Sequence, residues 1–122
     1  MKQEDFNTQF RLQTKKLALA IIKITSPLPY SDALGVMRKQ IIRASTSVAS
    51  NFRAVCRGRS EKERFSKLCI VVEEADETVF WLEMLVEAEF LTAKMTSVME
   101  QEALEILKVM SAYKKKLEPK FQ

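Results

Sequence analysis

The chain of 122 residues contains no histidine and only two cysteines, two glycines and three prolines. Without histidine it lacks the commonest general base, the usual activator of a nucleophilic serine and the Glu-x-x-His signature of di-iron bundles. Cys56 and Cys69 are too few for a four-ligand zinc site, and we expect both to be small buried thiols. No glycine-rich phosphate-binding motif is present. These absences predict a protein that is not an enzyme and that holds no metal and no cofactor.

Long apolar runs are also missing. No stretch approaches the ~20 apolar residues that span a bilayer, and the first ten residues, MKQEDFNTQF, lack the apolar region of a signal peptide. We therefore expect a soluble, cytoplasmic protein with no membrane partner. Two glycines and three prolines are too few for the turns of an all-β fold. With 47% hydrophobic and 30% charged residues, the chain has the composition of one globular domain over residues 1–122.

Apolar residues spaced alternately three and four apart are abundant, and this spacing is typical of helices in a bundle. It predicts four helices, over about 4–25, 33–56, 61–89 and 93–117. The residues expected to cap helix starts are Ser31 or Asp32, Ser60 and Thr92. Gly58 and Pro119 follow the ends of the second and fourth helices. We expect an all-α, antiparallel up-down-up-down four-helix bundle. One bent helix through 61–117 is the alternative, because the third turn is weakly marked.

Each helix has a predicted core seam. The seam of the third helix is Phe65, Leu68, Val72, Ala75, Val79, Leu82 and Val86. The seam of the second is Leu34, Met37, Ile41, Ala44, Val48, Asn51 and Val55, and that of the fourth is Met99, Ala103, Ile106, Met110, Tyr113 and Leu117. The first helix has the looser set Phe6, Phe10, Leu17, Ile21 and Ile24. Asn51 is the polar member of its seam, so we expect it to be buried and to fix the register.

The third helix has further apolar residues outside its seam. These residues are Ile70, Val71, Phe80, Trp81 and Met84. A helix that is apolar beyond one stripe lies at the centre of a larger core or at an interface. We therefore expect a homo-oligomer, with Phe80 and Trp81 as the main anchors of its interface.

Charge is separated along the chain. Residues 36–67 carry nine basic and two acidic side chains, whereas residues 68–107 carry one basic and ten acidic. Across a tight turn near residue 58, antiparallel packing places Arg43 opposite Glu73 and Lys39 opposite Glu77. We expect Arg38, Lys39 and Arg43 to be neutralised within the chain. Their expected acidic partners are Glu73, Glu74, Asp76 and Glu77.

The remaining basic residues converge on one end of the predicted bundle. Those near the second turn are Arg53, Arg57, Arg59, Lys62, Arg64 and Lys67, and those at the end of the fourth helix are Lys114, Lys115, Lys116 and Lys120. Solvated helix ends are one interpretation, since lysine is favoured near a helix C-terminus. A nucleic-acid surface is the other, because two clusters distant in sequence meet and arginine binds phosphate well.

The run from Gln40 to Phe65, QIIRASTSVASNFRAVCRGRSEKERF, resembles the signature of a bacterial four-helix-bundle family named for intervening sequences in large-subunit ribosomal RNA genes, also called the ribosomal protein S23 family. The matching positions are Gln40, Arg43, Ala44, Ser47, Asn51, Arg59, Ser60 and Phe65. The later EEADETVFWLEML resembles the third helix of that family. The chain departs from the family at Arg53-Ala54, where many relatives carry Glu-Gly.

The resemblance implies a ring-shaped homopentamer and no settled biochemical activity. The more distant accessory proteins of diversity-generating retroelements imply a basic ring surface that engages nucleic acid and a reverse transcriptase. We therefore expect a non-enzymatic, oligomeric bundle that binds RNA or another nucleic acid through its basic end. The alternative is a scaffold for a protein partner with no nucleic-acid role. An enzyme would require a metal or substrate between Glu73, Glu74 and Asp76.

Overall fold

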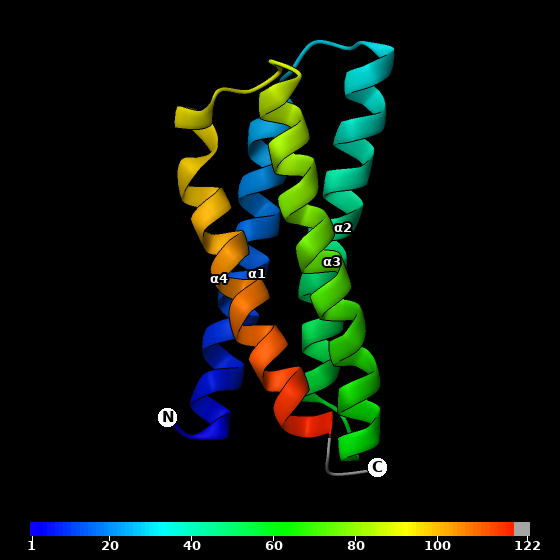
Figure 1. Cartoon of the computed structure of the whole chain (residues 1–122), viewed down its shortest axis with the longest axis vertical. Helices are drawn as coiled ribbons and strands as arrows, with labels where there is room; N and C mark the ends of the chain where they lie inside the picture. The colour runs from blue at the N-terminus through cyan, green and yellow to red at the C-terminus, as the bar shows by residue number, and fades with distance from the viewer. Residues whose placement is uncertain (119–122) are drawn as a thin grey trace.

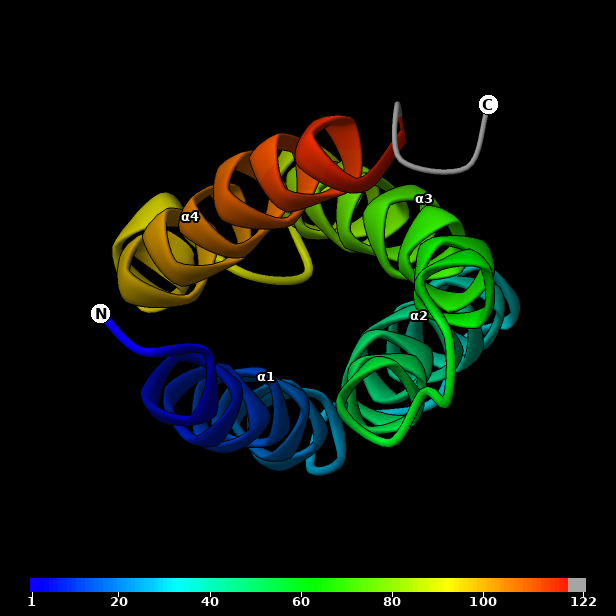
Figure 2. The ribbon, with the colours of Figure 1, turned by 90° about the horizontal axis from the view of Figure 1, so that it is seen from below.

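Four helices make up the part of the chain that the computed structural model describes, residues 1–118, and no strand occurs there (Figure 1). The helices are α1 (Gln3–Thr25), α2 (Asp32–Cys56), α3 (Glu61–Glu87) and α4 (Ala93–Leu117). Each runs antiparallel to the one before it, and they follow one another around a shared core (Figure 2). The predicted antiparallel four-helix bundle is confirmed. The described residues do not include Pro119, predicted to follow the fourth helix, or Lys120, predicted to join the basic residues at its end.

The four helix pairs do not pack equally. The interface between α2 and α3 is the most extensive, whereas α1 and α4 meet only sparsely. The bundle is therefore most open between its first and last helices. Within residues 1–118, no helix is both long enough and apolar enough to cross a membrane.

The second, third and fourth helices begin at side chains that cap them. Ser31, Ser60 and Thr92 each accept a hydrogen bond from the backbone N–H three residues on, at 3.2, 3.0 and 3.2 Å. A cap of this kind contributes about 1 kcal/mol, because it satisfies an amide that the helix leaves unpaired. The predicted helix starts are confirmed, with Ser31 rather than Asp32 as the cap of α2.

The turn between α3 and α4 closes by a Schellman motif. The N–H of Phe90 donates to the carbonyl of Leu85 and the N–H of Glu89 to that of Val86, both at 3.0 Å. Glu89 adopts the left-handed conformation at φ 66°, which glycine usually occupies in this motif. The helix stops at Glu87, so the prediction that it runs to residue 89 is too long, and the single bent helix through 61–117 is wrong.

The turn between α2 and α3 depends on Gly58. Its N–H donates to the carbonyl of Val55 at 3.1 Å, and its own carbonyl accepts from Arg64 Nη1 at 2.9 Å. A Cβ at this position would lie 2.4 Å from Cγ of Arg64. No described glycine has a positive φ, so Gly58 serves by leaving room for Arg64 rather than by a left-handed conformation.

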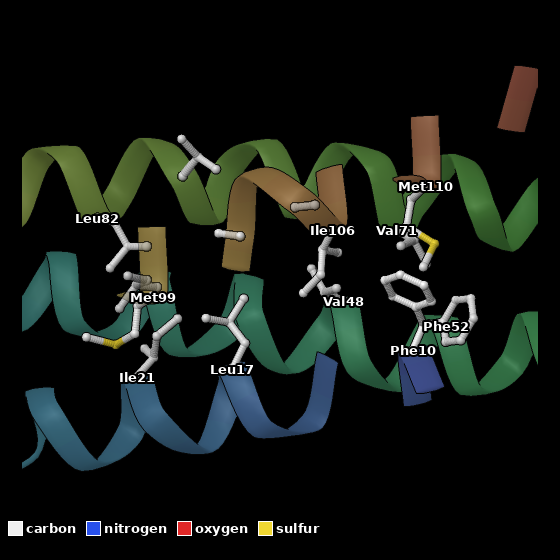
Figure 3. Close-up of a cluster of buried hydrophobic side chains, with 14 of the residues drawn as sticks. Phe10, Leu17, Ile21, Val48, Phe52, Val71, Leu82, Met99, Ile106 and Met110 are labelled. Carbon is white, nitrogen blue, oxygen red and sulfur yellow. The ribbon is translucent and has the colours of Figure 1, made fainter. Parts of the chain in front are cut away.

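Most of the predicted core is buried, but α3 is rotated from its predicted seam (Figure 3). All of the α4 seam is buried except Tyr113, which is half-buried. On α3, Val72 and Val86 are only half-buried, while Val71, Thr78 and Leu85 are fully buried. Placing Val71 on an outer face is therefore wrong. Hydropathy counts Thr78 as polar, and the apolar pattern therefore favours a stripe through Val72 and Val86 over the buried one through Val71, Thr78 and Leu85.

On α2, too, the residue next to the predicted one is buried. Phe52, not Asn51, enters the core, and its ring centroid lies 6.2 and 6.5 Å from those of Phe6 and Phe10. Asn51 is half-buried and donates to the carbonyl and Oγ of Ser47 at 2.9 and 3.0 Å. Its partners lie within its own helix, so the prediction that it is a buried residue fixing the register between helices is wrong.

Candidate nucleic-acid interface

The predicted basic residues lie at one end of the bundle, where the α2–α3 turn meets the start of α1 and the end of α4 (Figure 1). The residues placed there are Arg53, Arg57, Arg59, Lys62, Arg64, Lys67, Lys114, Lys115 and Lys116. We call them the basic end. The convergence follows from topology, because an even number of antiparallel helices returns the chain to the end at which it began.

Most cations of the basic end have free access to solvent. Arg53, Arg57, Lys62, Lys115 and Lys116 are exposed, while Lys67 and Lys114 are half-buried. These side chains can reach a bound phosphate without unfolding any part of the bundle.

Two arginines of the basic end have partners within the chain. Nε of Arg59 lies 3.8 Å from a carboxylate oxygen of Glu63, but this arginine is 90% exposed, so the pair is worth little. Arg64 is half-buried and holds the carbonyl of Gly58. The structure therefore gives Arg64 a role in the turn that the sequence did not suggest.

Two further cations join Arg53 and Arg57 from α1. Arg11 and Lys15 line a groove of about 560 Å³ between α1 and α2, on the side away from the core. We call it the α1–α2 groove; its apolar lining is Leu12, Ala18, Leu19, Ile22 and Ala49. Arg11 and Lys15 are not among the predicted basic residues, although antiparallel pairing across the first turn places Arg11 beside the C-terminal half of α2.

A second groove, of about 630 Å³, opens where α1 and α4 pack sparsely. Its lining includes Lys108, Lys116, Tyr113 and Cys56. Lys108 is not among the predicted basic residues. Burial raises the pKa of the Tyr113 hydroxyl and that of the Cys56 thiol. Cys56 and Cys69 are free and half-buried, not fully buried as expected.

Arg43 is the main electrostatic link between α2 and α3. Its Nη1 lies 2.7 Å from a carboxylate oxygen of Glu74, and its Nη2 donates to Glu77. Glu77 also accepts from Trp81 Nε1 at 3.2 Å. The hydrogen bond from Arg43, followed by that from Trp81, lowers the pKa of Glu77, and the bond to Glu77 raises the pKa of Arg43.

The charge pairing predicted across these helices is correct for Arg43 but wrong in register. Glu73 and Asp76 are exposed on the outer side of α3, since the helix is rotated as its core residues show. Glu77 binds Arg43 in place of Lys39. Arg38 does not pair with α3; its Nη1 donates to the carbonyls of Thr25 and Leu28, at 3.1 and 2.9 Å.

Val71 is buried, and the other four apolar residues expected outside the α3 seam, at an oligomer interface, differ in exposure. Phe80 is 49% exposed, whereas Ile70, Trp81 and Met84 are half-buried. The ring of Phe80 meets that of Trp81 edge-on, with centroids 4.9 Å apart. Phe80 therefore remains the most accessible anchor for an interface. Within residues 1–118, no three His, Cys, Asp or Glu residues cluster closely enough to hold a metal ion.

Comparison with known proteins agrees with this architecture. The sequence pattern of the 23S rRNA-intervening sequence protein family matches residues 7–112 of the chain. A crystal structure from Bacteroides thetaiotaomicron, of a protein with unknown function from the S23 ribosomal protein family, superimposes with a TM-score of 0.80 at 28% identity, over 89% of this chain and 97% of that one. No curated protein matches the chain. The fold and the extent of the match show that the chain belongs to the 23S rRNA-intervening sequence protein family.

Proposed function

We propose that this protein is a non-enzymatic helical bundle of the cytoplasm that binds RNA through its basic end and acts as a homo-oligomer. The observation that carries the proposal is the convergence of exposed cations from three separate segments. Arg57 and Lys62 flank the α2–α3 turn, and Lys115 and Lys116 arrive from the end of α4. Cations grouped in this way attract a phosphate backbone and release its counterions on binding.

Self-assembly strengthens the proposal, because each copy adds another basic end to one particle. The resemblance to its family suggests five copies in a ring, and exposed Phe80 supplies an apolar contact. Several weak phosphate contacts held on one particle bind far more tightly than one alone.

The test measures binding to a synthetic RNA hairpin, and to a DNA duplex of the same sequence, by fluorescence anisotropy at several salt concentrations. The variant carries Lys62→Glu, Lys115→Glu and Lys116→Glu, all at exposed positions. We expect its RNA affinity to fall about tenfold or more, and the slope of log affinity against log salt to fall by about two to three.

A matched control places the same three charge changes at the opposite end of the bundle, as Lys23→Glu, Lys39→Glu and Lys94→Glu, which are also exposed. Equal loss in both variants would mean that net charge alone matters and would contradict the basic end as a site. Equal affinity for RNA and for DNA would widen the ligand to nucleic acid in general.

The second candidate function is a scaffold for a protein partner, and the apolar lining of the α1–α2 groove favours it. Negligible RNA binding at low salt, together with stoichiometric recovery of one protein after nuclease treatment, would replace our proposal with this one.

A further inference from the structure

The outer side of α3 carries an acidic stripe with one aromatic residue at its centre. The stripe consists of Glu73, Asp76, Phe80, Glu83 and Glu87, spaced alternately three and four apart, and all five are exposed. This spacing aligns them along one side of the helix, away from the buried residues. An exposed ring among carboxylates suits a surface that carries both apolar side chains and cations.

The α1–α2 groove has that character. Arg11 and Lys15 line it from α1, Arg53 and Arg57 line it from α2, and none of the described residues that line it is acidic. Leu12 lies beside Arg11 and Leu19 lies one turn beyond Lys15, and these leucines are 66% and 48% exposed. Two leucines exposed to this extent in one groove are an unpartnered apolar surface.

We propose that the acidic stripe of one copy docks in the α1–α2 groove of a second copy, with Phe80 between Leu12 and Leu19. This inference rests on the proposed self-assembly and names the two surfaces that meet. Charge complementarity selects the occupant, since the stripe carries four carboxylates whereas the groove is lined by four cations and by no carboxylate among the described residues. A nucleic acid would satisfy the cations but would leave the leucines without an apolar partner.

The groove is long enough for all but about one turn of the stripe. From Glu73 to Glu87 the stripe spans about 21 Å, and from Arg11 to Ile22 the groove spans about 16 Å, at ~1.5 Å per residue. The groove volume of about 560 Å³ lies in the range of sites that enclose ligand-sized groups. A ridge of side chains on one helix packs readily into the groove between two others.

The topology makes this contact head-to-tail. Because α3 lies diagonally across the bundle from α1, the stripe and the groove are on different sides of the molecule (Figure 2). A copy cannot fill its own groove, so each copy offers one stripe and one groove, and the contact repeats from copy to copy, giving a ring where the rotation between copies closes. In the assembly Arg53 and Arg57 bind carboxylates. The part that the proposed function gives to Arg57 therefore passes to Lys62 and to Lys115 and Lys116 of α4, which are the residues varied in the RNA-binding test.

The test uses two variants that each lose one surface. Phe80→Lys removes the aromatic anchor and places a cation against the basic groove. Leu12→Glu with Leu19→Glu places carboxylates where the acidic stripe would dock. All three positions are exposed, so we expect both variants to keep the helical signal and melting temperature of the parent. Matched controls are Val36→Glu and Val98→Lys, at positions 59% and 64% exposed outside both surfaces.

Light scattering should find the parent and both controls in particles several times the chain mass of 14.1 kDa, and each variant alone at the chain mass. A 1:1 mixture of the two variants should form a dimer and nothing larger, because one intact stripe meets one intact groove and neither partner can continue. A mixture that stays monomeric, or a variant that assembles like the parent, would overturn the contact. Loss of assembly in Val98→Lys but not in Phe80→Lys would assign it to α4 instead.

These results separate the contact from the proposed function. If the parent is monomeric, the proposed self-assembly fails and the contact fails with it. If the parent assembles and the variants do too, only the contact fails. RNA binding by a single copy does not require the contact, since Lys62, Lys115 and Lys116 lie outside the groove lining and the stripe.

Discussion

Thr78 shows how one side chain decides which side of a helix enters the core. Hydropathy counts threonine as polar, yet Thr78 is fully buried because its hydroxyl donates to the carbonyl of Glu74, one turn back, at 2.8 Å. Thr14, Thr25 and Thr96 are buried with the same kind of bond. Hydropathy periodicity does not include this internal partner, and the predicted seam of α3 therefore contains Val72 and Val86, which are half-buried, in place of the buried Val71 and Leu85.

Glu77 should make stability depend on pH. Its pKa is lowered in the folded state, so its ion pair with Arg43 stabilises the fold above the unfolded pKa of about 4.3 and is lost as pH falls through the folded value. Both side chains are partly exposed, which limits the pair to about 0.5–1 kcal/mol. Glu77→Gln should therefore lower the free energy of unfolding by about that amount at pH 7 and by almost nothing near pH 3.

Urea denaturation at the two pH values measures this difference. Glu100→Gln is the control, at a half-buried carboxylate of α4 for which no ion pair occurs among the described residues. A Glu77→Gln deficit that is as large at pH 3 as at pH 7 would contradict an ion-pair origin.

Helix starts could be predicted from sequence, but contacts between helices could not. Ser60 and Thr92 predict helix starts correctly, because a cap is a local interaction between a side chain and a nearby backbone amide. The register of Arg43 against α3 depends on how far α3 is rotated, which no local pattern states. The α1–α2 groove was not predicted for the same reason, since Arg11 and Arg57 come to line one groove only when α1 and α2 pack.

The end of α3 offers a way to stabilise the bundle. Glu89 occupies the left-handed position of the Schellman motif, where a side chain costs about 1 kcal/mol relative to glycine. Glu89→Gly should raise the free energy of unfolding by about 0.5–1 kcal/mol, as measured by urea or thermal denaturation. The neighbouring Ala88→Gly, at φ −82°, should only destabilise. Equal effects of the two substitutions would show that the left-handed conformation is not the cause.

At the scale of the whole molecule, the sparse packing of α1 on α4 sets the order in which the bundle opens. Few side chains link the two helices: Gln13 donates to Glu105, and the rings of Phe6 and Tyr113 meet with centroids 5.4 Å apart. Helices α2 and α3 share the largest interface, so their amides should open only with the whole fold.

Hydrogen exchange followed by mass spectrometry should find α1 amides exchanging at least about tenfold faster than those in the middle of α3, a difference of ~1.4 kcal/mol in opening free energy. Helix α4 serves as the internal comparison, because it packs well on α3. Protection as strong in α1 as in α3 would show that all four helices open as one unit.

The even number of helices also decides how the protein should be handled. The start of α1 and the end of α4 lie at the same end as the α2–α3 turn (Figure 1). A purification tag or fluorescent protein fused before α1 or after α4 would therefore lie beside the basic end and would compete there with the proposed RNA ligand. A short peptide label inserted between Thr25 and Asp32, at the opposite end, would leave that surface uncovered.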